Sequence, residues 1–139
     1  MSSFPDMSAE QKESREDLAA RLTFEQFRVT QYGRTEKPFE NEYHKFTGEG
    51  RYHCVVCDEA LFESDTKFNS GTGWPSFWEP IDDALISNAG ALGDHSYAEN
   101  ACVKCGAHLG HVFDDAKTPT NLRYCMNSAS LRFVQATDD

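Results

Sequence analysis

The spacing of hydrophobic and polar residues changes near Gly50 and divides the chain into a helical first part and a β-rich second part. Two capping-box patterns, at residues 8–11 and 23–26, place Ser or Thr three positions before Gln. In such a pattern each side chain bonds the other residue's backbone N–H and starts a helix. We therefore expect short helices over residues 9–21 and 24–30, followed by a loop that reaches Gly50.

Beyond Gly50, short β-type segments alternate with turn residues. No helix long enough for a crossover connection separates these segments, so the pattern favours antiparallel pairing over a parallel βαβ arrangement. We predict a mainly β fold of the β+α kind, with antiparallel sheets and short N-terminal helices. The expected strands are residues 51–56, 84–88, 96–103, 108–113, 123–126 and 131–135.

The length of 139 residues suits one domain, and the aromatic residues are concentrated between Tyr52 and Phe133. We expect this domain to span residues 22–136, with residues 1–21 as a polar helical extension. The net charge of −10, from 13 Lys and Arg against 23 Asp and Glu, opposes binding to phosphate groups. We therefore expect no nucleic-acid partner and no membrane association. A monomer is expected as well.

The N-terminal residues show no basic segment followed by an apolar stretch, so we expect no secretory signal. No apolar run approaches the length needed to span a bilayer. A reducing cytoplasm is the expected location. In that compartment Cys-x-x-Cys pairs are more often metal-binding or redox-active than structural disulfides.

Four of the five cysteines form two such pairs, Cys54 with Cys57 and Cys102 with Cys105. A tight turn at this spacing lets both sulfurs face one ion, and two such turns complete a tetrahedron. We predict one structural Zn²⁺ whose closed thiolate shell leaves no position for water. The alternatives are two disulfides, or one redox motif beside an unrelated pair. A further alternative is a metal site made of Cys102, Cys105, His108 and His111.

The fifth cysteine, Cys125, lies in a β-type segment whose alternation places Arg123, Cys125 and Asn127 on one face. Arg123 would stabilise a thiolate there, and the amide of Asn127 would hold a polar substrate group, which suits a nucleophile. A single cysteine is more often a buried small apolar residue. The local sequence leaves both interpretations open.

Three longer motifs resemble the B family of methionine sulfoxide reductases. They are GWPSF at residues 73–77, CGAHLGHVF at 105–113 and RYCMNSASL at 123–131, and they occur together with the two Cys-x-x-Cys pairs. The likeness runs from residue 22 to residue 133. It implies a zinc-containing oxidoreductase that reduces methionine-R-sulfoxide to methionine and so repairs oxidised proteins. In this reaction Cys125 attacks the sulfoxide sulfur and becomes a sulfenic acid.

The same resemblance implies roles for neighbouring residues. His111 is the expected proton donor for the departing oxygen. His108 lies an odd number of residues away, on the opposite face of a regular strand unless a turn brings both inward, and a scaffold role stays open. Asp115 is expected to orient the histidine or a water, or else to be a solvated turn carboxylate. Trp74 and Phe113 are expected to form the apolar walls that hold the substrate's S-methyl group, with Arg123 beside them.

Position 72 departs from the family pattern. Many relatives have a Cys before Gly73 that attacks the sulfenic acid and closes a disulfide, whereas this chain has Thr72. With the other cysteines assigned to zinc, we expect oxidised Cys125 to be reduced by an external thiol, either thioredoxin, glutaredoxin or glutathione.

Two other functions fit parts of the pattern. A non-enzymatic zinc and β module would bind a peptide or small ligand around Trp74 and would not need a reactive Cys125. A zinc hydrolase using His108 and His111 would need an open metal position, which four thiolates do not leave.

Overall fold

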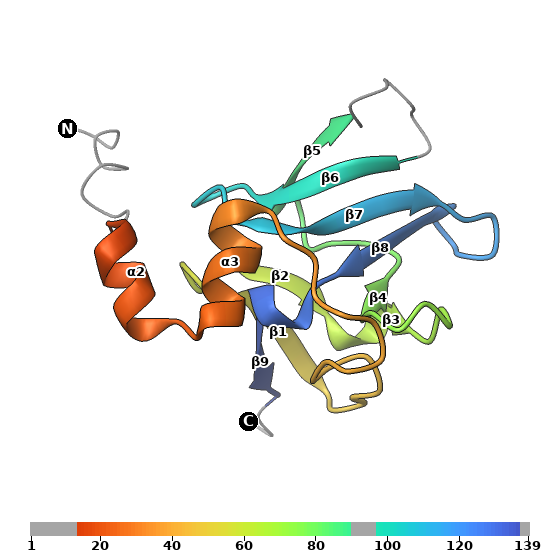
Figure 1. Cartoon of the computed structure of the whole chain (residues 1–139). Coiled ribbons are helices and arrows are strands. Elements are labelled where there is room, and N and C mark those ends of the chain that lie inside the picture. Colours follow the sequence, from red (N-terminus) through yellow and green to blue (C-terminus); the bar gives the residue numbers. More distant parts are fainter. Residues whose placement is uncertain (1–13, 90–96, 137–139) are drawn as a thin grey trace.

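The computed structural model describes residues 14–89 and 97–136. Its described part consists of two antiparallel sheets with two helices beside them (Figure 1). The helices are α2 (Arg15–Arg21) and α3 (Phe24–Tyr32), and the 3-10 turns are η1 (Ser64–Thr66) and η2 (Ser128–Ser130). The strands are β1 (Gly50–Cys54), β2 (Ala60–Glu63), β3 (Lys67–Phe68), β4 (Ser76–Phe77), β5 (Leu85–Ala89), β6 (Tyr97–Cys102), β7 (His108–Asp114), β8 (Leu122–Met126) and β9 (Leu131–Gln135).

The smaller sheet has the order β2-β1-β9, and the larger has the order β3-β4-β8-β7-β6-β5. Each strand pair in both sheets is antiparallel, which confirms the predicted pairing. The six predicted strands correspond to β1 and β5 to β9. The sequence did not indicate β2, β3 and β4, because these strands have only two to four residues and β4 directly follows a proline.

The capping box predicted at residues 23–26 is present and starts α3. Thr23 Oγ1 accepts from the Gln26 N–H, and Gln26 Oε1 accepts from the Thr23 N–H. The helix ends at Gly33, which has the left-handed φ of 70° that glycine adopts without strain. The first predicted helix is shorter than expected in the described part, because Ser14 is the N-cap of α2. The other capping box, at residues 8–11, lies outside the described residues.

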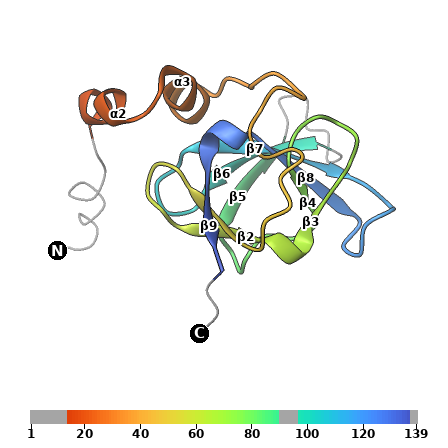
Figure 2. The same cartoon turned by 90° about the horizontal axis from the view of Figure 1, so that it is seen from below.

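Helix α2 packs against the first Cys-x-x-Cys turn. Leu18 is buried, and the Arg21 guanidinium donates to the carbonyl oxygens of Val55 and Val56, at 3.4 and 2.6 Å. Figure 2 shows α2 and α3 together on one side of the sheets. The described part of the predicted N-terminal extension, residues 14–21, therefore packs against the rest of the domain. None of the described helices has the length and apolar character that crossing a membrane requires.

Aromatic rings fill the space between the two sheets. Tyr52 and Phe62 come from the smaller sheet, Phe77 comes from the larger, and all three are fully buried. Phe62 stacks on Phe77 with ring centroids 4.2 Å apart, and Tyr52 meets Phe77 edge-on at 5.1 Å. Each buried ring of this size contributes ~1.5–3 kcal/mol. This core supports β4 and β8 from behind, so the side chains on their other face are held in place.

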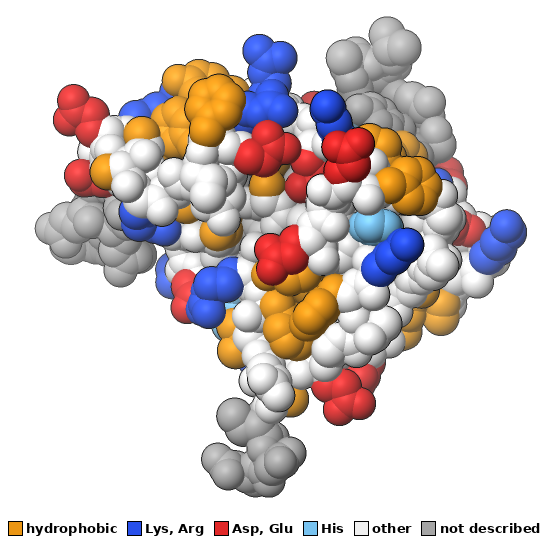
Figure 3. Space-filling view, turned by 60° about the horizontal axis from the view of Figure 1, so that its bottom comes forward, with side chains coloured by type: hydrophobic (Ala, Val, Ile, Leu, Met, Phe, Trp, Pro, Cys, Tyr) orange, Lys and Arg blue, Asp and Glu red, His pale blue; other side chains and the backbone are white. Residues whose placement is uncertain are grey.

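On the molecular face in Figure 3, Lys and Arg side chains are interspersed with Asp and Glu. The positive charges of this face therefore do not form one continuous stripe. A nucleic-acid binder draws most of its non-specific affinity from such a stripe.

Candidate active site

Cys125 lies near the middle of the larger sheet. It is on β8 between β4 and β7, where its backbone neighbours are Ser76 on one side and His111 on the other. The residue is 7% exposed. Pairing on both sides fixes the strand, so the direction of the Cys125 thiol is set by the sheet and not by a mobile loop.

A pocket of about 110 Å³ opens beside this thiol. Such a volume is far below the ~300–1,000 Å³ of sites for drug-sized ligands and suits a small head group. Six of the residues that the sequence assigned to catalysis or substrate binding line it, and Thr35 is an addition that no sequence signal indicated. The lining consists of Thr35, Trp74, His111, Phe113, Arg123, Cys125 and Asn127.

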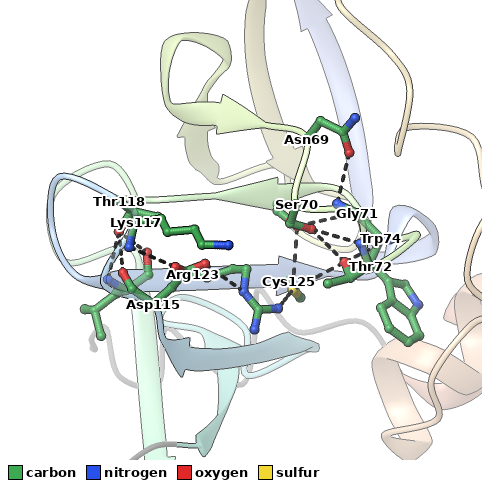
Figure 4. Close-up of polar contacts among 12 residues, drawn as sticks. Asn69, Ser70, Gly71, Thr72, Trp74, Asp115, Lys117, Thr118, Arg123 and Cys125 are labelled. Carbon is green, nitrogen blue, oxygen red and sulfur yellow. Dashed lines mark hydrogen bonds and ion pairs between the residues drawn. The ribbon is translucent and has the colours of Figure 1, made fainter.

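Arg123 connects the thiol to Asp115 (Figure 4). Its Nη1 is 3.1 Å from Cys125 Sγ, and its Nε donates to Asp115 Oδ2 at 3.2 Å. The guanidinium also lies over the Phe113 ring, 4.8 Å from the centroid. The guanidinium is thus held in place by Asp115 and Phe113 and donates a charge-assisted hydrogen bond to the Cys125 sulfur. Asp115 thus contacts Arg123. Its expected part in orienting the histidine or a water stays a prediction.

Replacing Asp115 by Asn is expected to lower kcat/KM about tenfold in the reaction for which Cys125 is the expected nucleophile. The Asn carbonyl still accepts from the Lys117 N–H, as Asp115 Oδ1 does at 3.0 Å, but its NH₂ group offers Arg123 no acceptor. A hydrogen bond to a charged group contributes ~1.5–3 kcal/mol, so losing it releases the guanidinium from Cys125. Steady-state kinetics measures the effect. The exposed neighbour Asp114→Asn is the control, and equal losses in both variants would contradict this role.

Three hydroxyl groups lie near the Cys125 sulfur. Ser76 Oγ is 3.6 Å and Thr72 Oγ1 is 3.8 Å from Sγ, and Ser70 Oγ joins these two hydroxyls at 2.7 and 2.8 Å (Figure 4). Neither Thr72 nor Ser76 lines the pocket. The thiol of Cys125 therefore has hydroxyl contacts in addition to Arg123. Sequence reasoning had singled out Thr72 but not the two serines.

His108 and His111 are neighbours, because β7 is irregular. The β6–β7 register shifts between Asn100 and Ala101, opposite the residues between the two histidines. Such a bulge adds a residue to one strand and turns its side chains. The imidazole centroids are consequently 5.5 Å apart, edge to face, and not on opposite faces as in a regular strand.

Of the two histidines, only His111 lines the pocket. Burial lowers its pKa, while the carboxylate of Glu99, 3.9 Å away across the β6–β7 pair, raises it. Burial lowers the pKa of His108 as well, and the charge of His111 lowers it further. Among the described residues, His108 Nε2 is buried without a hydrogen-bond partner. The geometry thus gives His111, and not His108, access to a bound ligand.

The amide of Asn127 holds two backbone segments together. Its Oδ1 accepts from the Glu36 N–H at 2.9 Å, and its Nδ2 donates to the Leu109 carbonyl at 3.1 Å. Asn127 is 2% exposed. These two bonds already use part of the amide's hydrogen-bonding capacity. The expected contact with a polar substrate group can therefore use only the part that is left.

Glu36, in the loop between α3 and β1, was not indicated by the sequence. Its carboxylate accepts from the N–H groups of Ser128 and Ala129 at 2.5 and 2.8 Å, and its carbonyl accepts from Trp74 Nε1 at 3.0 Å. Burial raises the pKa of Glu36 to about 7. The loop that was predicted to lead to Gly50 therefore contacts two pocket residues, Trp74 and Asn127.

The four remaining cysteines meet at one point. Cys54 Sγ is 3.6 Å from Cys105 Sγ, Cys57 Sγ is 3.5 Å from Cys102 Sγ, and all four sulfurs lie within 4.8 Å of one another. Tetrahedral Zn²⁺ with ~2.3 Å bonds to sulfur requires sulfurs ~3.8 Å apart. Among the described residues, the cluster contains neither His108 nor His111, which opposes the mixed alternative. The donor set fits one structural zinc ion.

Two features of the cysteine cluster support a cation. Both turns have the same form, with the Asp58 N–H donating to the Cys54 carbonyl and the Gly106 N–H donating to the Cys102 carbonyl, each at 2.8 Å. The four sulfurs are also too close together for all of them to be thiolates without a cation, because like charges repel. A bound zinc ion removes this conflict, because all four sulfurs can then be thiolates.

The SelR domain family matches residues 22–135. The peptide methionine sulfoxide reductase MsrB of Synechococcus sp. (strain RCC307) is 49% identical over 128 residues, which are 89% of this chain and 92% of that protein. This chain belongs to the methionine sulfoxide reductase B family. Methionine-R-sulfoxide reductase B3, mitochondrial, from Mus musculus is 49% identical over 127 residues, 88% of this chain and 49% of that protein.

The part matched to the methionine sulfoxide reductase B family contains all residues of the pocket and all four clustered cysteines, whereas α2 precedes it. Among solved structures, the Mis18 "Yippee-like" domain gives a TM-score of 0.48 at 16% identity, covering 65% of this chain and 99% of that domain. That likeness is too weak to add to the family assignment.

Proposed function

We propose that this protein reduces methionine-R-sulfoxide in oxidised proteins to methionine, with Cys125 as the nucleophile. The observation that carries the proposal is the position of the Cys125 thiol. It lies at a small, mainly apolar pocket, in contact with a fixed guanidinium and beside His111. Trp74 and Phe113 supply apolar surface for the S-methyl group, since sulfur and methyl groups pack well on aromatic rings.

In the reaction, the Cys125 thiolate attacks the sulfoxide sulfur while His111 gives a proton to the sulfoxide oxygen. The attack forms a bond between the two sulfurs; this bond and the bond between oxygen and the methionine sulfur then break as an S–O bond forms at Cys125. The methionine sulfur gains two electrons and Cys125 loses two, so methionine departs and Cys125 is left as a sulfenic acid. Arg123 holds the Cys125 sulfur in place through their hydrogen bond before the attack.

An external thiol completes the cycle. It attacks the sulfenic acid, releases water and forms a mixed disulfide with Cys125, and a second thiol then restores Cys125 and leaves as the disulfide. Thioredoxin, glutaredoxin and glutathione all supply this chemistry. The other four cysteines belong to the zinc-site cluster, and Thr72 has no thiol, which supports an external source.

The catalytic unit comprises residues 22–136, and it acts as a monomer in a reducing compartment such as the cytoplasm. Structural Zn²⁺ on Cys54, Cys57, Cys102 and Cys105 holds β1 and the turn before β7 together.

The decisive experiment is turnover on separated R and S epimers of a blocked methionine sulfoxide, with each class of thiol donor. We expect reduction of the R epimer at least about a hundredfold faster than reduction of the S epimer, because each reductase class takes one epimer. Failure with the R epimer under every donor would remove the proposed function.

The Thr72→Cys variant is expected to form an intramolecular disulfide after one equivalent of methionine sulfoxide. A thiol at the position of the Thr72 hydroxyl, 3.8 Å from Cys125 Sγ, needs only a small movement to reach the ~2.05 Å of a disulfide. Intact-mass analysis and dimedone trapping measure the outcome. Wild type should give a dimedone adduct at Cys125, and a wild-type disulfide with any zinc-site cysteine would contradict the external-thiol cycle.

The Glu99→Gln variant is expected to move the alkaline fall of kcat/KM to lower pH. His111 must be protonated to donate, so the rate falls as pH rises through its pKa, and Glu99 raises that pKa. The pair is half exposed, and exposed ion pairs contribute ~0–1 kcal/mol, so we expect a shift of up to about 0.7 pH unit. The control is the exposed Glu49→Gln. A shift to higher pH would contradict the roles given to Glu99 and His111.

A further inference from the structure

We propose that Glu36 is a positioning residue that fixes two walls of the substrate pocket, Trp74 and Asn127, relative to each other. The proposal rests on the proposed function, because it assigns Glu36 a part in holding the sulfoxide. Glu36 itself does not line the pocket, and its neighbour Thr35 does.

The main chain of Glu36 joins the two walls directly. Its N–H donates to Asn127 Oδ1 at 2.9 Å, and its carbonyl accepts from Trp74 Nε1 at 3.0 Å. Trp74 precedes β4, and Asn127 follows β8, so these side chains come from separate segments of the larger sheet. One peptide segment thus determines the rotation of the indole and the orientation of the amide.

The carboxylate of Glu36 fixes that segment to the sheet. It accepts from the N–H groups of Ser128 and Ala129, the two residues after Asn127, at 2.5 and 2.8 Å. Glu36 is 5% exposed, and both burial and the charge of Glu25 on α3 disfavour its ionisation. Its buried carboxylate accepts from both N–H groups at once, whereas a glutamine in its place would offer one oxygen.

The small size of the pocket makes the fixed positions of Trp74 and Asn127 important for substrate binding. A pocket of about 110 Å³ leaves little freedom, and displacing a group by ~1 Å can cost a hundredfold in rate. Loss of the Glu36 carboxylate releases the loop, and the Trp74 wall should then lose its fixed orientation. We expect this to appear mainly as weaker substrate binding.

The experiment compares Glu36→Ala and Glu36→Gln with the exposed loop residue Glu40→Ala as control. All are made on a Trp78→Phe background, so that Trp74 gives the only indole N–H signal in the NMR spectrum. KM and kcat for the R epimer are measured per correctly folded molecule. We expect KM to rise about tenfold in Glu36→Ala and less in Glu36→Gln, with a shifted and faster-exchanging indole N–H.

Two outcomes would overturn the proposal. In one, the Glu36 variants have a lower melting temperature while KM and the indole signal match those of Glu40→Ala, so Glu36 serves stability alone. In the other, neither stability nor KM changes. If Glu36→Ala does not fold, Glu36→Gln decides between these results. A parent protein inactive on the R epimer defeats the proposed function, and the indole signal still tests whether Glu36 positions Trp74.

Discussion

The Cys125→Ser variant is expected to lose reduction of methionine-R-sulfoxide by a factor on the order of a thousand or more. A serine hydroxyl is far less nucleophilic than a thiolate, and Arg123, 3.1 Å from the sulfur, cannot ionise it near neutral pH. Because Cys125 is separate from the cysteine cluster, the variant's zinc content and melting temperature should stay close to those of the wild-type protein. Single-turnover assays and metal analysis measure both quantities.

The behaviour of Cys125 distinguishes an enzyme from a non-enzymatic binding module. Dimedone should label wild-type Cys125 after exposure to the sulfoxide and should leave Cys125→Ser unlabelled. Activity within tenfold of wild type in Cys125→Ser would mean that another group carries the chemistry. An inert wild-type Cys125 would favour a non-enzymatic module that binds ligands around Trp74.

The Cys54→Ser variant is expected to lose zinc and to unfold. Structural zinc supplies ~10–16 kcal/mol in small zinc domains, and the total stability of a domain is ~5–15 kcal/mol, so three thiolates with a weak fourth ligand should not sustain the fold. Cys54 is fully buried at the end of β1, where it pairs with Leu131 of β9, directly after the last residue that pairs with β2. Circular dichroism and zinc released to a chelator measure the loss.

His108→Ala provides the matched control for the zinc prediction. It removes a partly buried side chain three residues after Cys105 but no sulfur ligand, so zinc should remain bound. Retained zinc in Cys54→Ser together with lost zinc in His108→Ala would instead support the mixed cysteine and histidine site.

Much of the fold and site followed from regular spacing. Two Cys-x-x-Cys pairs must each turn sharply to face one ion, so the cluster could be predicted without knowledge of the sheets. Alternation along β8 brought Arg123, Cys125 and Asn127 to one pocket because that strand is regular. These predictions depended on local geometry alone.

Irregular or long-range features could not be predicted from the sequence. The shift in register within β6 and β7 joins His108 to His111, and no residue pattern marks it. Asp115 pairs with Arg123 across the turn between β7 and β8, which requires knowing that these strands pair. Glu36 lies in a polar loop, and its role depends on two distant residues. Trp74 is 38 positions away along the chain, and Asn127 is 91 positions away.

Met126, directly after Cys125 on β8, is fully buried in the core. Its side chain faces the opposite side of the strand from the reactive sulfur, in line with strand alternation. An oxidant that reaches Cys125 through the pocket therefore has no open route to this thioether. Burial therefore protects the Met126 sulfur, whereas the sulfenic acid that forms on Cys125 is an oxidised state that a thiol can restore.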